Sequence, residues 1–535
     1  MTSDPDRAFF GHPKGLATLF FTEMWERFSY YGMRAFLIFY LAAPEDLGGK
    51  GMFVLNKAGE QEPSGAAGAI VGVFGASVYL LSLPGGWIAD RFIGQRKGVM
   101  IGGFGIAAGN ALLAIPGTGD LFYVGLVLIA LGTGFLKPNV STIVGQLYRP
   151  DDLRRDAGYT IYYMGINIGA TAAPIACGIL AQDPQFRAFL ADSGINPNYC
   201  WNFAFGAAAV GMVGGLISYS AGQRALGDAG LHPTIPDDPV RAERDRNILK
   251  VIIGALVALA VIVAATAPSK KTITDAMGVG LGLGSIALFY GLYRSARDAS
   301  ERRRIIAMVP LFVGAIGFFG IFEQSPTTLN IYAESHTERE FLGLNIPASF
   351  YQSVNGFFIV ALAPLFAWIW VKLARARKEP TSVNKFAIGM AILALSFVVM
   401  LPSLASIDAG QRVSPMYLIM LYLLYTCAEL CISPVGLSSM SKLAPQRLAG
   451  MVMGTWFLGT SIGIYLAGRA SEISEVRGFR FLFVFLIVCS LVMSAALFLV
   501  APMIRRMMGK EATATSEPAE LPVAIAKEIP KDKKN

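Results

Sequence analysis

Apolar residues fill spans of about 20 positions along most of the chain, and short polar stretches separate the spans. A helix of that length crosses the hydrocarbon core of a bilayer. The pattern therefore predicts an all-α integral membrane protein with about fourteen transmembrane helices. We expect them to cover approximately residues 15–42, 66–90, 97–116, 121–145, 156–181, 200–223, 246–267, 275–297, 305–333, 348–376, 384–403, 414–443, 449–469 and 479–507.

The first apolar span carries polar side chains along one side. In a helix of about 3.6 residues per turn, five polar residues fall within an arc of about 100°. Four charges facing lipid would cost about 10 kcal/mol or more on insertion scales. This side must therefore face a protein interior or a water-filled cavity, which is typical of a transporter. The five residues are Glu23, Glu26, Arg27, Tyr30 and Arg34.

The charge distribution favours a membrane protein and argues against a nucleic-acid partner. Of the 535 residues, 54% are hydrophobic and only 15% are charged, against about 25% in a typical soluble domain. The net charge of +8 comes from Arg and Lys in alternate short loops, such as Arg91, Arg96 and Lys97. By the positive-inside rule, these loops and both termini are expected to be cytoplasmic. We expect no cleavable signal at the polar N-terminus.

The two halves of the chain repeat one another weakly. Four short matches recur in the same order at an offset of roughly 290 residues, among them Lys137-Pro138 with Ser433-Pro434. Six helices, two inserted helices and six further helices are predicted, and parallel repeats of this kind suit alternating access. The expected domains are a cytoplasmic N-terminus (1–14), a six-helix bundle (15–223), a linker with two extra transmembrane helices (224–304), a second six-helix bundle (305–507) and a disordered cytoplasmic tail (508–535).

The charges deep in the spans are distributed unequally between the two halves of the chain. The deep cations Arg27, Arg34 and Lys137 belong to the first half, whereas Glu323 and Glu429 belong to the second. A cavity between the halves would thus carry opposite charges on its two walls. Such a cavity fits a zwitterion, of which a small free peptide is an example. The alternative is that these charges form structural salt bridges, and for the i, i+4 pair Glu23–Arg27 the two roles remain equally open.

Other polar or reactive residues in the spans carry weaker signals. For Tyr79 and Trp456, a role in helix packing or as an anchor at the membrane interface is as compatible with the sequence as a role in a binding pocket. Cys427 and Cys431 lie one helical turn apart, but no His lies near them in sequence, so apolar packing is preferred to a metal site. We therefore predict no metal and no cofactor.

Six short motifs are distributed along the chain. They are ExxERFxYYG from Glu23, GWIADRxxGxRK from Gly86, GTGFLKPNV from Gly132, YYMGINIG from Tyr162, Glu429-x-x-x-Ser433-Pro434-x-Gly436 and Trp456-Phe-Leu. These motifs resemble those of the proton-dependent oligopeptide transporters, a family within the major facilitator superfamily. The resemblance covers nearly the whole chain and includes the two extra helices of the bacterial branch. It implies a major facilitator fold and the uptake of di- and tripeptides coupled to inward proton movement.

The resemblance also implies roles for the matching residues. Animal members of the family have a His in helix 2, and its absence here shifts the expected proton chemistry to carboxylates. Proton coupling would involve Glu23, Glu26, Arg27 and Glu323. The substrate-binding residues would be Arg34 and Lys137 at the peptide carboxylate, Asn167, Asn355 and Glu429 at the amino end, and Tyr30, Tyr79, Ser433 and Trp456 elsewhere in the pocket.

The sequence thus predicts a monomeric proton:peptide symporter of the bacterial inner membrane, driven by the proton gradient. A first alternative is the same fold carrying nitrate or a peptide-like drug. A membrane-embedded enzyme is disfavoured because no His/Asp metal cluster and no credible nucleophile–base pair occurs in the sequence. A channel or sensor is disfavoured by the repeated halves.

Overall fold

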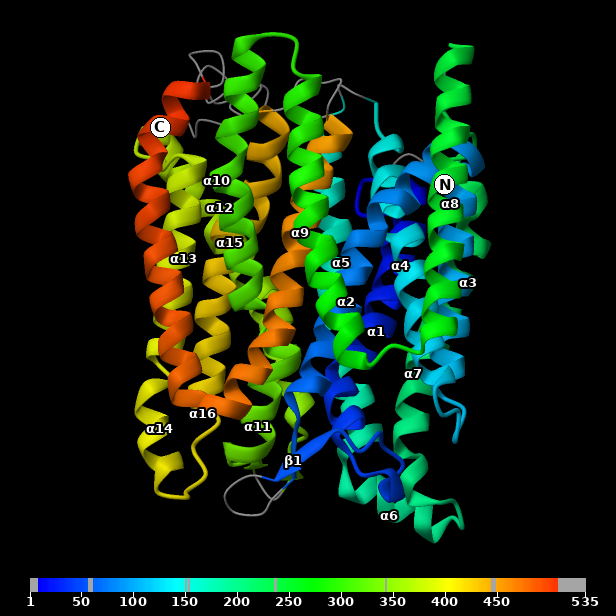
Figure 1. Cartoon of the computed structure of the whole chain (residues 1–535), viewed down its shortest axis with the longest axis vertical. Helices are drawn as coiled ribbons and strands as arrows, with labels where there is room; N and C mark the ends of the chain where they lie inside the picture. Colours follow the sequence, from blue (N-terminus) through cyan, green and yellow to red (C-terminus); the bar gives the residue numbers. More distant parts are fainter. Residues whose placement is uncertain are drawn as a thin grey trace, which may run out of the picture.

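The computed structural model describes residues 8–55, 61–149, 152, 154–234, 238–341, 344–443 and 449–508. Long helices, roughly parallel to one another, form one bundle (Figure 1). The first half contributes α1 (Lys14–Ala42), α2 (Gly65–Ile88), α3 (Gln95–Leu113), α4 (Leu121–Gln146), α5 (Arg155–Gln182) and α7 (Cys200–Gly222). After α8 (Pro239–Thr266) and α9 (Lys270–Ser295) come α10 (Ala299–Phe322), α12 (Tyr351–Arg375), α13 (Ser382–Val398), α15 (Met416–Leu443) and α16 (Ala449–Met508).

Short elements lie in the connections between the long helices. Two antiparallel hairpins pair β1 (Phe53–Leu55) with β2 (Gln61–Pro63) and β3 (Glu340–Phe341) with β4 (Leu344–Asn345). The short helices are α6 (Pro184–Asp192), α11 (Asn330–His336) and α14 (Leu401–Asp408). Residues 1–7 of the expected N-terminal segment and 509–535 of the expected tail lie outside the described residues, as does Arg447.

Membrane-spanning helices account for the bundle. Among the described residues, 11 stretches are long and apolar enough to cross a membrane. One of them, Met451–Ile504, is bent at Gly478 into two spans. α1 and α3 are the two remaining spans: α1 carries five charged residues, and α3 begins with the polar run Gln95-Arg96-Lys97. Together they form two six-helix bundles and two inserted helices, which confirms the predicted all-α membrane fold.

Two local sequence signals shape the second half. Pro326 follows the end of α10 and cannot donate a backbone hydrogen bond, and the chain passes there through a π-helical turn, η6 (Ser325–Leu329), into α11. Glu323 lies at the end of α10, just before this turn. Gly478 adopts φ 78° within α16, a conformation that favours glycine, and it reverses the chain between the last two spans.

The two halves pack on each other reciprocally. α2 of the first half packs against α16, and α12 of the second half packs against α5. The α2–α16 contact is a seam of small residues: a Cβ at Gly72 would lie 2.7 Å from the Cα of Gly468, and one at Gly68 would collide with Ser471. Small residues of this kind let helix backbones approach closely inside a membrane.

Contacts at one end of the bundle join the halves further. Gln182, at the end of α5, donates from Nε2 to Glu334 Oε2 at 3.3 Å and accepts from the Ser349 backbone N–H, also at 3.3 Å. This end carries β1 and α6 and lies opposite the described chain ends (Figure 1). Toward the start of α5, Tyr163 and Met164 are 41% and 37% exposed. The Gln182 hydrogen bonds therefore join the two halves at the β1 end and close this end of the bundle.

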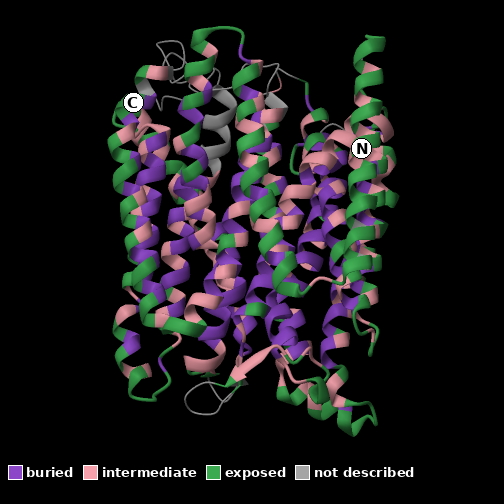
Figure 2. Ribbon diagram, in the orientation of Figure 1, coloured by how far each residue is buried: buried purple, intermediate pink, exposed green. Residues whose placement is uncertain are grey.

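The burial pattern separates the inserted helices from the rest. Buried residues concentrate where the bundle helices face one another, and the outer faces are exposed (Figure 2). α9 packs against α2, α10 and α16, so it contacts both halves. None of the apolar window of α8 is buried in the protein, which leaves this helix to contact lipid.

Candidate functional site

A cavity of about 370 Å³ lies between the two halves. Ligand-binding cavities usually measure about 300–1,000 Å³, so this one suits a small molecule. The first half supplies side chains from α1, α2, α4 and α5, and the second half supplies them from α10, η6, α12, α15 and α16. Eleven of the thirteen predicted site residues line it: Glu23, Arg27, Arg34, Tyr79, Lys137, Asn167, Glu323, Asn355, Glu429, Ser433 and Trp456.

The α1 charges form a compact buried network. Arg27 Nε lies 2.5 Å from Glu26 Oε2 and 3.2 Å from Glu23 Oε1. All three side chains are almost fully buried, and Glu26 lies behind the cavity wall, outside the lining. One oxygen of each carboxylate and Nη2 of Arg27 have no hydrogen-bond partner among the residues that the structure describes. The network therefore has free acceptor sites for protons, in addition to its structural ion pair.

One ion pair crosses between the halves inside the cavity. Arg34 of α1 pairs with Glu323, which stands at the end of α10. Both side chains are largely buried, so their interaction is weakly screened by solvent. A charge that competes for Arg34 would remove one of the links between the two halves.

Lys137 has no carboxylate partner. Its Nζ lies 4.0 Å from the centre of the Tyr79 ring, close enough for a cation–π interaction, and it makes no ion pair with any described residue. Pro138 follows it inside α4, and a Cβ at Gly86 of α2 would approach the Pro138 ring to 3.2 Å. Close α2–α4 packing therefore fixes the position of Lys137, and its charge is available to a ligand.

The opposite wall holds a carboxylate without a cation. Asn355 Nδ2 donates to Glu429 Oε2 at 3.3 Å and to Thr426 Oγ1 at 3.1 Å. Glu429 makes no ion pair within the described part of the chain. The cavity thus presents a free cation from the first half and a free carboxylate from the second.

Two residues that were predicted to bind substrate are placed differently from that prediction. Tyr30 does not line the cavity: it is buried against Phe74 of α2, with ring centroids 6.2 Å apart. Asn167 does line it, but its Nδ2 donates to the Tyr163 carbonyl of its own helix at 2.9 Å. Cys427 and Cys431 are free thiols, and the described residues contain no cluster of His, Cys, Asp or Glu suited to a metal.

Several lining residues were not among the predicted site residues. Gln352 stands one turn before Asn355 on α12 and donates to the Ala35 carbonyl at 3.2 Å. Tyr422 and Tyr425 precede Glu429 by two turns and one turn on α15. Helical spacing in the sequence could have indicated these residues. Positions i−3, i−4 and i−7 lie on the same helix face as residue i, so they share a face with the predicted site residues Asn355 and Glu429.

Comparison with known proteins places this arrangement in a family. Residues 96–479 match the family described as the POT family. The chain belongs to the POT family. The resemblance inferred from the motifs is thereby confirmed, and because POT proteins are transporters, this chain is a membrane transporter and not an enzyme.

Individual POT proteins resemble the chain over nearly its full length. The peptide transporter YePEPT of Yersinia enterocolitica subsp. palearctica is 37% identical, covering 86% of this chain and 88% of its own. A di-/tripeptide transporter of Lactococcus lactis subsp. cremoris is 35% identical over 94% and 98% of the two chains. A crystal structure of a peptide transporter POT in complex with sulfate matches with a TM-score of 0.82 at 39% identity, covering 95% of this chain and 98% of that one.

Proposed function

We propose that this protein is a proton-coupled symporter that imports di- and tripeptides by alternating access, with the proton gradient as its driving force and no cofactor. Membership of the POT family supports transport. The relatives described as peptide and di-/tripeptide transporters, at 37% and 35% identity, support the substrate class.

One observation carries the proposal: an unpaired cation, Lys137, and an unpaired carboxylate, Glu429, line the same cavity from opposite halves. A free peptide has a carboxylate at one end and an ammonium at the other. The carboxylate binds Lys137 and Arg34 through charge-assisted hydrogen bonds. The ammonium binds Glu429 and the Asn355 side-chain oxygen. A peptide bound in this way joins the two walls and favours their closure around it.

Proton coupling follows from the Arg34–Glu323 pair. A peptide carboxylate at Arg34 competes with Glu323 for the guanidinium. A carboxylate that loses its cation partner binds a proton more readily, so peptide binding and protonation of Glu323 reinforce each other. Glu23 and Glu26, bound to Arg27, form a second group of carboxylates that can exchange a proton with the cavity side.

The proposal includes a location and an orientation. The protein is a monomer in the bacterial inner membrane with both termini in the cytoplasm. The basic loops at alternate connections support this orientation.

A purely anionic substrate such as nitrate is disfavoured because Glu429 would repel it. A peptide-like drug that keeps both charged ends would satisfy the same residues. Such compounds are expected to compete with dipeptides for uptake.

The test is uptake of labelled dialanine into proteoliposomes with an imposed inward proton gradient. We expect accumulation above the external concentration, saturation with substrate, and inhibition by an excess of unlabelled dipeptide. An ionophore that collapses the gradient should stop accumulation and leave only equilibration.

Two controls separate the parts of the proposal. N-acetyl-dialanine keeps the carboxylate but lacks the ammonium, so it should compete poorly. Accumulation indifferent to the gradient would contradict proton coupling, whereas inhibition by nitrate but not by dipeptides would contradict the substrate class.

A further inference from the structure

The exposed inserted helix α8 begins with charged residues and continues as an apolar span. Its residues 241–250 include four cations and two carboxylates, and none of the described positions in its apolar window is buried in the protein. Figure 2 shows α8 exposed over most of its length. Its charged end lies on the side of the bundle that carries the described chain ends (Figure 1). The charged turns therefore meet lipid headgroups, and the apolar turns meet acyl chains.

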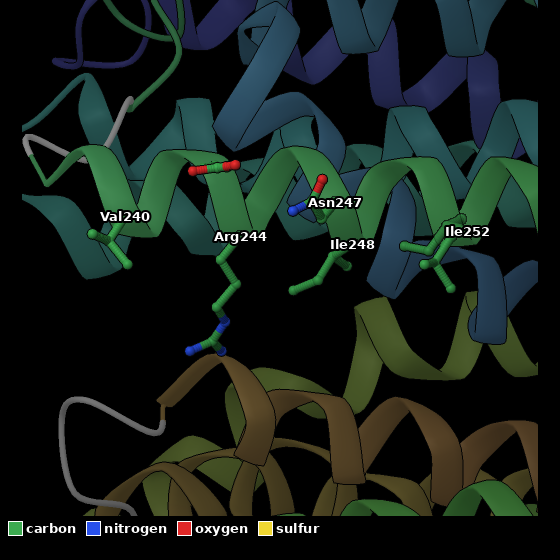
Figure 3. Close-up of a pocket in the computed structure, with 7 residues that line it drawn as sticks. Val240, Arg244, Asn247, Ile248 and Ile252 are labelled. Atoms are coloured by element: carbon green, nitrogen blue, oxygen red, sulfur yellow. The ribbon is translucent and has the colours of Figure 1, made fainter.

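A shallow hollow of about 510 Å³ follows this boundary. After Val240, its polar residues come first along the helix, and the apolar residues Ile248, Val251 and Ile252 follow over the next turns. Figure 3 shows Arg244 extending from α8 into open space, with Val240, Ile248 and Ile252 on the same side. The lining residues on α8 are Val240, Glu243, Arg244, Asn247, Ile248, Val251 and Ile252.

The two charges in this hollow are unpaired. Glu243 and Arg244 are exposed, and neither forms an ion pair or hydrogen bond with the described residues, including each other. Neighbouring charges are engaged: Arg241 pairs with Asp238 at 3.5 Å, and Asp245 pairs with Arg91 at 3.7 Å. The hollow thus presents one cation and one carboxylate from adjacent positions of α8, both without a partner among the described residues.

We propose that this hollow binds phosphatidylethanolamine in the leaflet on the side of the chain termini. The lipid phosphate accepts hydrogen bonds from Arg244 and Asn247, and the primary ammonium donates to Glu243. An acyl chain lies along Ile248, Val251 and Ile252. The inference rests on α8 alone and is independent of the transported substrate.

Glu243 and Arg244 together discriminate among phospholipids. Phosphatidylcholine has the same phosphate, but its ammonium is fully methylated and has no N–H to donate to Glu243. Phosphatidylglycerol offers no ammonium, and its negative charge is repelled by Glu243. The exposed Arg246 and Lys250 do not line the hollow and attract any anionic surface without distinguishing headgroups.

The experiment reconstitutes the full-length protein in nanodiscs containing equal amounts of phosphatidylethanolamine, phosphatidylcholine and phosphatidylglycerol. Native mass spectrometry then counts the lipids retained after release. We expect phosphatidylethanolamine to be retained over phosphatidylcholine by about two- to five-fold, the range of one exposed ion pair.

Matched variants assign the effect to the two charges. Glu243→Gln should bring retention of phosphatidylethanolamine down to that of phosphatidylcholine and leave the latter unchanged. Arg244→Gln should reduce retention of both. Arg246→Gln removes an exposed cation outside the hollow and should preserve the preference.

Three results would overturn the proposal. They are equal retention of phosphatidylethanolamine and phosphatidylcholine by the unaltered protein, preferential retention of phosphatidylglycerol, and an undiminished preference in Glu243→Gln. Retention by the unaltered protein decides the question even where a variant fails to fold.

Discussion

The charged side chains on the two walls of the central cavity have different kinds of partner. On the first-half wall, Glu23 and Arg27 form a connected network with Glu26 behind it, and Lys137 rests against an aromatic ring. On the second-half wall, Glu429 is held by neutral groups among aromatic side chains. Arg34–Glu323 is the described ion pair that joins the walls inside the cavity.

This difference indicates where a ligand acts. A charge that is already neutralised within its own wall contributes little to the binding of a charged ligand. A charge that has only an amide or an aromatic ring beside it gains the most interaction energy when a ligand of opposite charge binds. Lys137 and Glu429 are therefore expected to matter most for binding, and the α1 network for protons. The predictions below test this division.

The largest effect is expected at Lys137. Lys137→Ala removes a half-buried cation that pairs with the peptide carboxylate in the proposed binding mode, and dipeptide uptake should fall by about 100-fold, the upper range for a hydrogen bond to a charged group. Uptake into proteoliposomes measures it, with Lys378→Ala, an exposed loop lysine, as the control. Unchanged uptake in Lys137→Ala would remove this residue from the binding site.

The next largest effect concerns the closed end. Gly72→Leu puts a side chain where a Cβ alone would already collide with Gly468, and such overpacking costs about 1–3 kcal/mol. The halves should separate there, which lengthens the distance between spin labels at Asp192 and Val476.

Gly280→Leu on α9 supplies the matched control, because a Cβ there meets no atom within 4 Å. Identical label distances in Gly72→Leu and the parent protein would mean that the α2–α16 seam does not hold this end closed.

A smaller effect is expected at Glu429. Glu429→Gln keeps an acceptor oxygen but loses the charge, so the half-saturation concentration for dialanine should rise by about 10-fold. The discrimination against N-acetyl-dialanine should shrink in parallel. If the variant still rejects the acetylated dipeptide as strongly as the parent does, Glu429 does not recognise the amino end.

The smallest effect belongs to a surface pair. Arg480 and Asp408 form an ion pair outside the cavity, and their side chains are 60% and 64% exposed. Exposed pairs contribute about 0–1 kcal/mol, so Asp408→Asn should leave uptake unchanged and shift the apparent Tm by no more than about 2 °C. A large loss of uptake would show that charges outside the cavity also control transport.

Much of the fold and the charged part of the site could be predicted from the sequence. The length of the apolar stretches predicts the membrane-spanning helices, because the thickness of the bilayer determines that length. For example, α2 covers residues 65–88, where 66–90 was expected. Lys137, Glu323 and Glu429 were recognised because charges inside a membrane need a wet or paired environment.

The remaining features of the site depend on which helices pack against one another. Local patterns in a single sequence do not reveal these contacts. Tyr30 and Arg34 share an arc of α1, yet Phe74 of α2 buries Tyr30 away from the cavity. Gln352 and Tyr425 line the cavity but were not predicted as site residues, because their place in it depends on which helices face them. The pairing of Gly72 with Gly468 likewise requires knowing which helices of the two halves touch.

The single glycine between the last two spans has a mechanical consequence. Because Gly478 alone reverses the chain inside α16, the final two helices meet without slack. A tilt of the arm that bears Trp456 cannot be absorbed by a flexible connection and must be passed directly to the last helix. We therefore expect lipid packed beside that outer helix to influence how easily the two halves rearrange.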